Sequence, residues 1–135
     1  TVIKSGDFCA VLPKNHPLAK KQSLVLGDFA DEPFLLLEEG AYSEPLEAFR
    51  AASIEPNIKL CAHDDYSILS MVEQGLGISI LTELVLNKTN YDIAVLPIKP
   101  SIIRTMSIVT KDKRRLPLAS KEFIRCLNEH KNDLN

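Results

Sequence analysis

Side chains able to hydrogen-bond a small molecule lie in two stretches of the sequence, residues 37–46 and 62–70. Each stretch connects an expected strand to an expected helix, and their hydroxyl groups belong to Tyr42, Ser43, Tyr66, Ser67 and Ser70. In open α/β sheets, small molecules bind where the C-terminal ends of strands meet helix N-termini. The unpaired N–H groups at such junctions favour anions. These hydroxyls are therefore candidate ligand contacts.

Carboxylates accompany the hydroxyls in both stretches, at Glu38, Glu39, Asp64 and Asp65. They allow three interpretations: they disfavour a carboxylate ligand, they bind the amino group of an amino-acid-like ligand, or they are solvated caps. The last interpretation is favoured for the acids. Ser43 and Ser67 have the same alternative, because serine is common at helix N-termini.

Metal binding and nucleotide binding are not indicated. The three histidines (His16, His63 and His130) have no metal-ligand spacing, and neighbouring positions of Cys61-Ala-His63-Asp64 would point to opposite faces of a strand. Gly75-Leu-Gly77 follows a helix and lacks a third glycine, so it is a turn rather than a dinucleotide loop. No serine, histidine and acid pattern identifies a catalytic triad. We expect no enzyme activity, no cofactor and no metal.

The elements that would position the two stretches follow from short apolar runs. Strands are expected at residues 8–12, 34–37, 58–62, 78–81, 93–96 and 103–109. Longer helices are expected at about 43–52, 64–74 and from 117 onward, with helical turns at 24–30 and 84–87. Pro45 falls in a first turn, where a missing N–H costs little, and Gly75 supplies a left-handed stop. Strands alternating with helices predict an α/β domain with a mixed, mostly parallel sheet.

Composition narrows the class of protein. The 135 residues carry 16 basic and 18 acidic side chains, a net charge of −2, whereas a domain that binds nucleic acid through phosphates is expected to be basic. Three widely spaced cysteines argue against a disulfide framework and fit a reducing cytoplasm. No apolar run approaches the ~20 residues of a membrane span. The first residues are not a signal peptide, and the chain is expected to start within a domain.

Three groups of residues resemble the effector-binding domains of LysR-type transcriptional regulators, in the family's order and over nearly the whole chain. The first comprises Asp7-Phe-Cys-Ala-Val-Leu-Pro13, His16-Pro-Leu-Ala19 and Leu26-Gly-Asp-Phe-Ala-Asp-Glu-Pro-Phe34. The second comprises Asp65, Ile68, Met71-Val72 and Gly75-Leu-Gly-Ile-Ser-Ile-Leu81. The third comprises Arg104-Thr-Met-Ser-Ile-Val109 and Ser120-Lys-Glu-Phe-Ile124. Each group is weak alone, and together they are specific.

The resemblance implies a fold like that of type II periplasmic binding proteins, with two α/β lobes, two crossover strands and an effector in the cleft. Residues 1–21 would be a remnant of lobe one with the first crossover, residues 22–103 a complete lobe two, and residues 104–135 the second crossover and a last helix of the partial lobe one. Lobe two would present Glu39 and the five hydroxyls to the cleft. Thr82 stands where the family usually has proline, which would add a hydroxyl there.

The function implied is a cytoplasmic ligand-sensing domain that binds a carboxylate or amino-acid-like effector and controls a separate winged helix-turn-helix. DNA would be bound only through that absent domain. Family effector domains pair antiparallel, so we also expect self-association. The alternative is a solute-binding protein or receptor of the same fold, which the three unpaired cysteines disfavour, and an enzyme of this fold ranks third.

Overall fold

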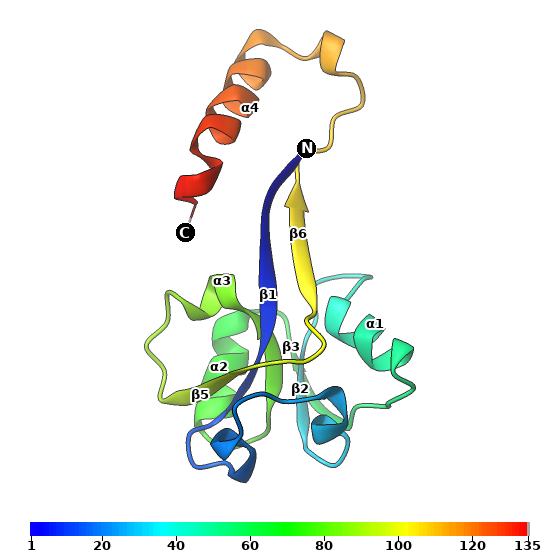
Figure 1. The fold of residues 1–135 in the computed structure, drawn as a ribbon, viewed down its shortest axis with the longest axis vertical. Coiled ribbons are helices and arrows are strands. Elements are labelled where there is room, and N and C mark those ends of the chain that lie inside the picture. The colour runs from blue at the N-terminus through cyan, green and yellow to red at the C-terminus, as the bar shows by residue number, and fades with distance from the viewer. Residues whose placement is uncertain (135) are drawn as a thin grey trace.

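One long strand, β1 (Val2–Pro13), runs from the N-terminus down into the larger, lower part of the molecule in the computed structural model, which describes residues 1–134 (Figure 1). Its second half is buried, with side chains that alternate between two apolar clusters. Phe8, Ala10 and Leu12 belong to one cluster, and Val11 belongs to the other. β1 therefore forms the centre of the main body, residues 8–102. It also begins earlier than the expected strand, because Val2–Asp7 pair with a second strand.

The sheet is mixed, as expected. β1 pairs antiparallel with β4 (Ser79–Thr82), β5 (Ile93–Pro97) and β6 (Ile103–Ser107), whereas β2 (Phe34–Leu37) and β3 (Ile58–Ala62) pair in parallel. A single parallel bridge between Phe34 and Ile78 connects the two sheets in the order β3-β2-β4-β1-β5. The expectation of a mostly parallel sheet is wrong, because β4 and β5 both flank β1, which runs in the opposite direction.

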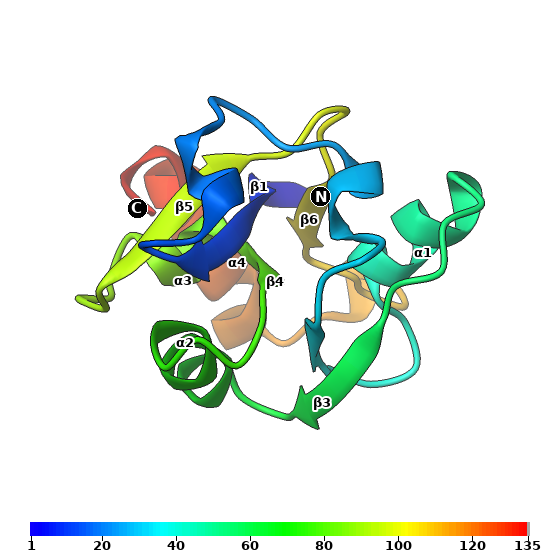
Figure 2. The ribbon, with the colours of Figure 1, turned by 90° about the horizontal axis from the view of Figure 1, so that it is seen from below.

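Helices cover both faces of this sheet. α1 (Glu44–Ala51) packs Phe49 and Leu46 into the cluster of Phe8 and Leu12. α2 (Asp65–Glu73) packs its buried residues, Ile68, Leu69 and Val72, against Val11 on the other face (Figure 2). α3 (Glu83–Leu86) is a single turn after β4, and four short 3-10 helices occupy Pro17–Lys20, Leu26–Phe29, Lys113–Arg115 and Lys131–Asp133.

Local signals fix the ends of the two main helices. Ser43 is the N-cap of α1 and accepts a hydrogen bond from the N–H of Leu46 at 3.3 Å, while Pro45 lies in the first turn. Asp64 caps α2 in the same way. Gly75 has φ +79° and its N–H donates to the carbonyl of Val72 at 2.9 Å, so the predicted left-handed stop is confirmed.

β3 is more exposed than its sequence predicts. Ile58 and Leu60 are 42% and 41% exposed, although their alternation is typical of a strand with one buried face. β3 lies at the edge of the sheet and pairs only with β2 among the described strands, and neither Ile58 nor Leu60 belongs to a core cluster. The apolar side chains of β3 therefore remain open to a further partner.

Outside the main body, the first half of β1 pairs with β6 and forms a two-stranded ribbon. Val2–Asp7 pair there with Ile103–Ser107. α4 (Leu118–His130) lies at its far end, beside the N-terminus (Figure 1). No residue of α4 is buried, and Phe123 is 65% exposed.

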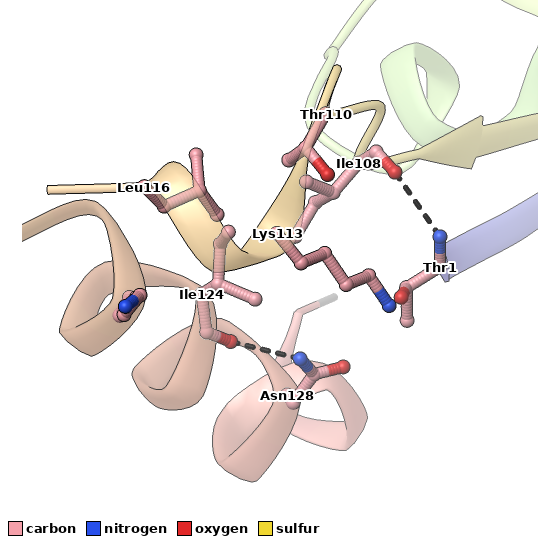
Figure 3. Close-up of a pocket in the computed structure, with 8 residues that line it drawn as sticks. Thr1, Ile108, Thr110, Lys113, Leu116, Ile124 and Asn128 are labelled. Atoms are coloured by element: carbon pink, nitrogen blue, oxygen red, sulfur yellow. Dashed lines mark hydrogen bonds between the residues drawn. The ribbon is translucent and has the colours of Figure 1, made fainter.

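A pocket of about 240 Å³ separates α4 from the ribbon (Figure 3). Thr1 and Ile108, which hydrogen-bond each other through their backbones, form one wall, and Ile124 and Asn128 form the other. No helix within residues 1–134 is long and apolar enough to span a bilayer.

Candidate functional site

The two polar stretches lie side by side. β2 and β3 are parallel neighbours, so their carboxyl ends meet at the same edge of the sheet. The N–H of Glu38 donates to the carbonyl of Ala62 at 2.8 Å, and the His63 ring nitrogen Nδ1 lies 3.4 Å from the carbonyl oxygen of Glu38. The structure therefore brings the first stretch, residues 37–46, next to the second, residues 62–70.

The first stretch borders a recess of about 420 Å³. Its walls include Glu38, Glu39, Gly40, Ser43 and His63. Ser43 is half-buried, and its oxygen already accepts the capping hydrogen bond of α1, so its O–H remains available as a donor. Tyr42 lies on the same loop, is 65% exposed, and does not line the recess.

The second stretch presents its hydroxyls on the exposed side of α2. Ser67 donates its hydroxyl to Asp64 Oδ2 at 2.5 Å, so this serine is engaged with the helix cap. Ser70 is exposed, and Tyr66 is 60% exposed. Thr82 is only 5% exposed, at the end of β4 opposite Phe8. The effector contacts that the sequence predicts thus include five exposed or half-buried hydroxyls on one sheet edge and a buried one on β4.

Arg104 is the central residue that the sequence did not identify as part of the site. Its Nε and one terminal nitrogen donate to the two carboxylate oxygens of Glu44, each at 2.9 Å. Its terminal nitrogens also donate to both carboxylate oxygens of Glu39, at 3.1 and 2.5 Å. The guanidinium carbon lies 5.0 Å from the centroid of the Phe8 ring, a cation–π arrangement. Arg104 thus connects β6, β1, the loop after β2 and the start of α1.

Charge on this edge of the sheet is unbalanced. Hydrogen bonds from Arg104 hold the pKa of Glu44 below its ordinary range. The pKa of Asp65 is raised, first because burial disfavours its charged form and then because Glu39 is close. One guanidinium therefore lies near three carboxyl groups, Glu39, Glu44 and Asp65, and hydrogen-bonds the first two.

Residues 1–134 contain no group of three or more histidine, cysteine, aspartate or glutamate side chains placed to hold a metal ion. In the nearest sequence cluster, Cys61 is an exposed free thiol and His63 Nδ1 lies 3.7 Å from Glu38 Oε2.

The sequence profile of the LysR substrate binding domain family matches residues 2–132. The chain belongs to this family. The match spans the ribbon, the main body and α4, so the LysR-type resemblance of the three residue groups is confirmed along the whole domain.

Curated relatives of this LysR domain are transcriptional regulators. The transcriptional dual regulator GltC of Bacillus subtilis is 29% identical over 126 residues, which cover 90% of this chain and 42% of GltC. The chain spans less than half the length of the curated relatives that it matches.

Solved structures show the same fold. The effector-binding domain of QuiR in complex with shikimate superposes with a TM-score of 0.77 and 24% identity, covering 98% of this chain and 64% of that domain. The effector-binding domain of BenM with benzoate gives a TM-score of 0.70 and 17% identity, covering 99% of this chain and 61% of that domain. This member of the LysR substrate binding domain family therefore has the fold of LysR effector-binding domains and covers less than two thirds of each of these two.

Proposed function

We propose that this chain senses a small-molecule effector and, within a longer LysR-type regulator, controls DNA binding by a separate winged helix-turn-helix. The observation that carries the proposal is the meeting of two polar strand-to-helix junctions at one sheet edge, beside the ribbon, in a chain of this family. Binding at such an edge is general for α/β sheets.

The lobes are assigned in the same proposal. Residues 22–103 form lobe two, residues 1–21 hold the first crossover, and residues 104–135 hold the second crossover and a helix of lobe one. The ribbon of β1 and β6, with α4 beyond it, supports this division. β1 continues into the core of the main body, so the first crossover and lobe two share this strand.

The effector class we propose is a carboxylate or an amino-acid-like molecule. The contacts proposed on lobe two are Glu39, Tyr42, Ser43, Tyr66, Ser67, Ser70 and Thr82. Shikimate in QuiR and benzoate in BenM are small carboxylates, which supports this class. Self-association of the domain belongs to the same proposal, with DNA bound elsewhere in the regulator.

Titration of the ¹⁵N-labelled chain with shikimate, benzoate and a panel of amino acids tests the proposal. We expect amide shifts at residues 37–46 and 62–70. Tyr42→Phe and Ser70→Ala remove exposed hydroxyls, and each should weaken binding about fivefold, the equivalent of one hydrogen bond. Ser101→Ala removes an exposed hydroxyl elsewhere and is the control. Shifts confined to other surfaces, or equal affinities in all three variants, would refute the proposed site.

A further inference from the structure

The donors of Arg104 are engaged by two protein carboxylates. Glu44 and Glu39 each meet the guanidinium with both oxygens, the paired geometry with which arginine binds carboxylates. A carboxylate ligand in the recess would accept hydrogen bonds from the same N–H groups of Arg104. His63 also lies at this edge, near Glu38, and Arg104 is the basic side chain there that meets two carboxylates in paired geometry.

The two glutamates differ in how firmly they are held. Glu44 is the first residue of α1, directly after the N-cap Ser43, and its side chain is 20% exposed. Glu39 lies on the loop after β2, outside any helix or strand, and its side chain is 36% exposed. It precedes Gly40, whose φ is +116°, a conformation that glycine adopts readily. Glu39 is thus the partner that can leave without disturbing a helix.

Arg104 would keep its place if Glu39 left. Its guanidinium lies over Phe8, which is 4% exposed in the core, and it keeps both hydrogen bonds to Glu44. The donors released would be those that now point to Glu39, and Glu39 itself borders the 420 Å³ recess together with Ser43. The vacated edge of the guanidinium would therefore lie beside the recess.

We propose that Glu39 is an internal competitor for the effector, and that an effector carboxylate takes its place on Arg104. This inference rests on the proposed function and refines it: Arg104 is the receptor of the effector carboxylate, and Glu39, named above as a contact, acts by competing with that carboxylate. While Glu39 is bound, Glu39 and Glu44 outweigh the single guanidinium, and the edge repels anions. When Glu39 swings away, Arg104 still meets the carboxylate of Glu44, and the incoming carboxylate takes the place of Glu39 charge for charge.

The Nη–H signals of Arg104, which belong to the donors that meet Glu39, test the exchange in ¹⁵N spectra of the full chain, with benzoate and shikimate as probes. Glu39→Gln removes the competing charge and should tighten binding of both probes about tenfold or more, because hydrogen bonds between charged groups are roughly twice as strong as neutral ones. Arg104→Lys keeps the charge but loses the paired donors, and should weaken binding relative to the unmodified chain. Glu47→Gln is the matched control, since Glu47 pairs with Arg50 on α1.

We expect Glu39→Gln to bind both probes more tightly, with an Arg104 signal that shifts on binding. The affinity of Glu47→Gln should equal that of the unmodified chain. Equal affinities in these two variants, or binding that leaves the Arg104 signal in place, would overturn the inference. If binding leaves the Arg104 signal in place but shifts the amide signals of residues 37–46 and 62–70, the proposed function still stands. If neither the unmodified chain nor Glu39→Gln binds any probe or amino acid, both proposals fail.

Discussion

Gly77 and Pro33 approach so closely that a Cβ atom at Gly77 would lie 2.4 Å from the carbonyl oxygen of Pro33. The same carbonyl accepts a hydrogen bond from the N–H of Ile78 at 2.9 Å, at the bridge that connects β2 to β4. Gly77→Ala should therefore push the two strands apart and lower the free energy of unfolding by roughly 1–3 kcal/mol, as overpacking does. Urea unfolding measures this change.

The control for that prediction is Gly27→Ala. A Cβ atom at Gly27 would meet no atom within 4 Å. The free energy of unfolding should stay within about 0.5 kcal/mol of the original, as is usual for surface substitutions. Equal unfolding midpoints for the two alanine variants would contradict the close approach.

Gly75→Ala tests backbone conformation without a steric clash. Gly75 has φ +79°, and no atom lies within 4 Å of a Cβ placed there. The left-handed conformation alone should cost about 1 kcal/mol or more of unfolding free energy for an L-residue with a Cβ. Gly75→Asn should cost less, because asparagine tolerates this conformation better. Equal losses in the two variants would argue against the left-handed stop.

The ion pair between Glu44 and Arg104 predicts a pH-dependent stability. The pKa of Glu44 is lower in the folded chain than in the unfolded chain, where it is roughly 4.3. Its contribution is therefore complete above the unfolded pKa and is lost as the pH falls through the folded pKa. Urea unfolding should give Glu44→Gln a lower free energy of unfolding than the original chain at pH 7, and this difference should disappear below about pH 4. A difference of constant size would rule out this linkage.

The isolated domain should not bind DNA. Its net charge is −2, and neutralisation of phosphates by basic side chains supplies most nonspecific affinity. Fluorescence anisotropy with duplex DNA should show no binding at low salt. An affinity that falls steeply with salt concentration would mean that this domain itself contacts phosphates.

The exposed apolar side chains of α4 predict self-association. Leu118 and Phe123 are 76% and 65% exposed, and large apolar patches are rare on monomers. We expect the chain to sediment as more than one copy of 15.0 kDa. Phe123→Ser should shift it toward the monomer, whereas Glu129→Gln on the same helix should not. A monomer at all concentrations would count against this expectation.

Much of the local structure can be predicted from the sequence, because the signals involve neighbouring residues. Apolar periodicity located all six strands and the longer helices to within a few residues, apart from the early start of β1. Ser43, Pro45 and Gly75 marked helix ends through their own backbone and side-chain chemistry. The family resemblance implied that the two polar stretches face one cleft, and the parallel pairing of β2 with β3 in the structure explains why they meet.

The tertiary structure alone decided how distant segments pair. Arg104 and Glu39 are separated by 65 residues, and no local pattern indicates that one neutralises the other. The antiparallel orientation of β1 relative to β4 and β5 likewise depends on how the chain connects strands that are distant in sequence. The exposure of Ile58 and Leu60 depends on whether a neighbour covers β3, which periodicity within five residues does not encode. Interactions between neighbouring residues determine the strands and helices that carry the candidate hydroxyls. Long-range packing brings the charged Arg104 to the same sheet edge.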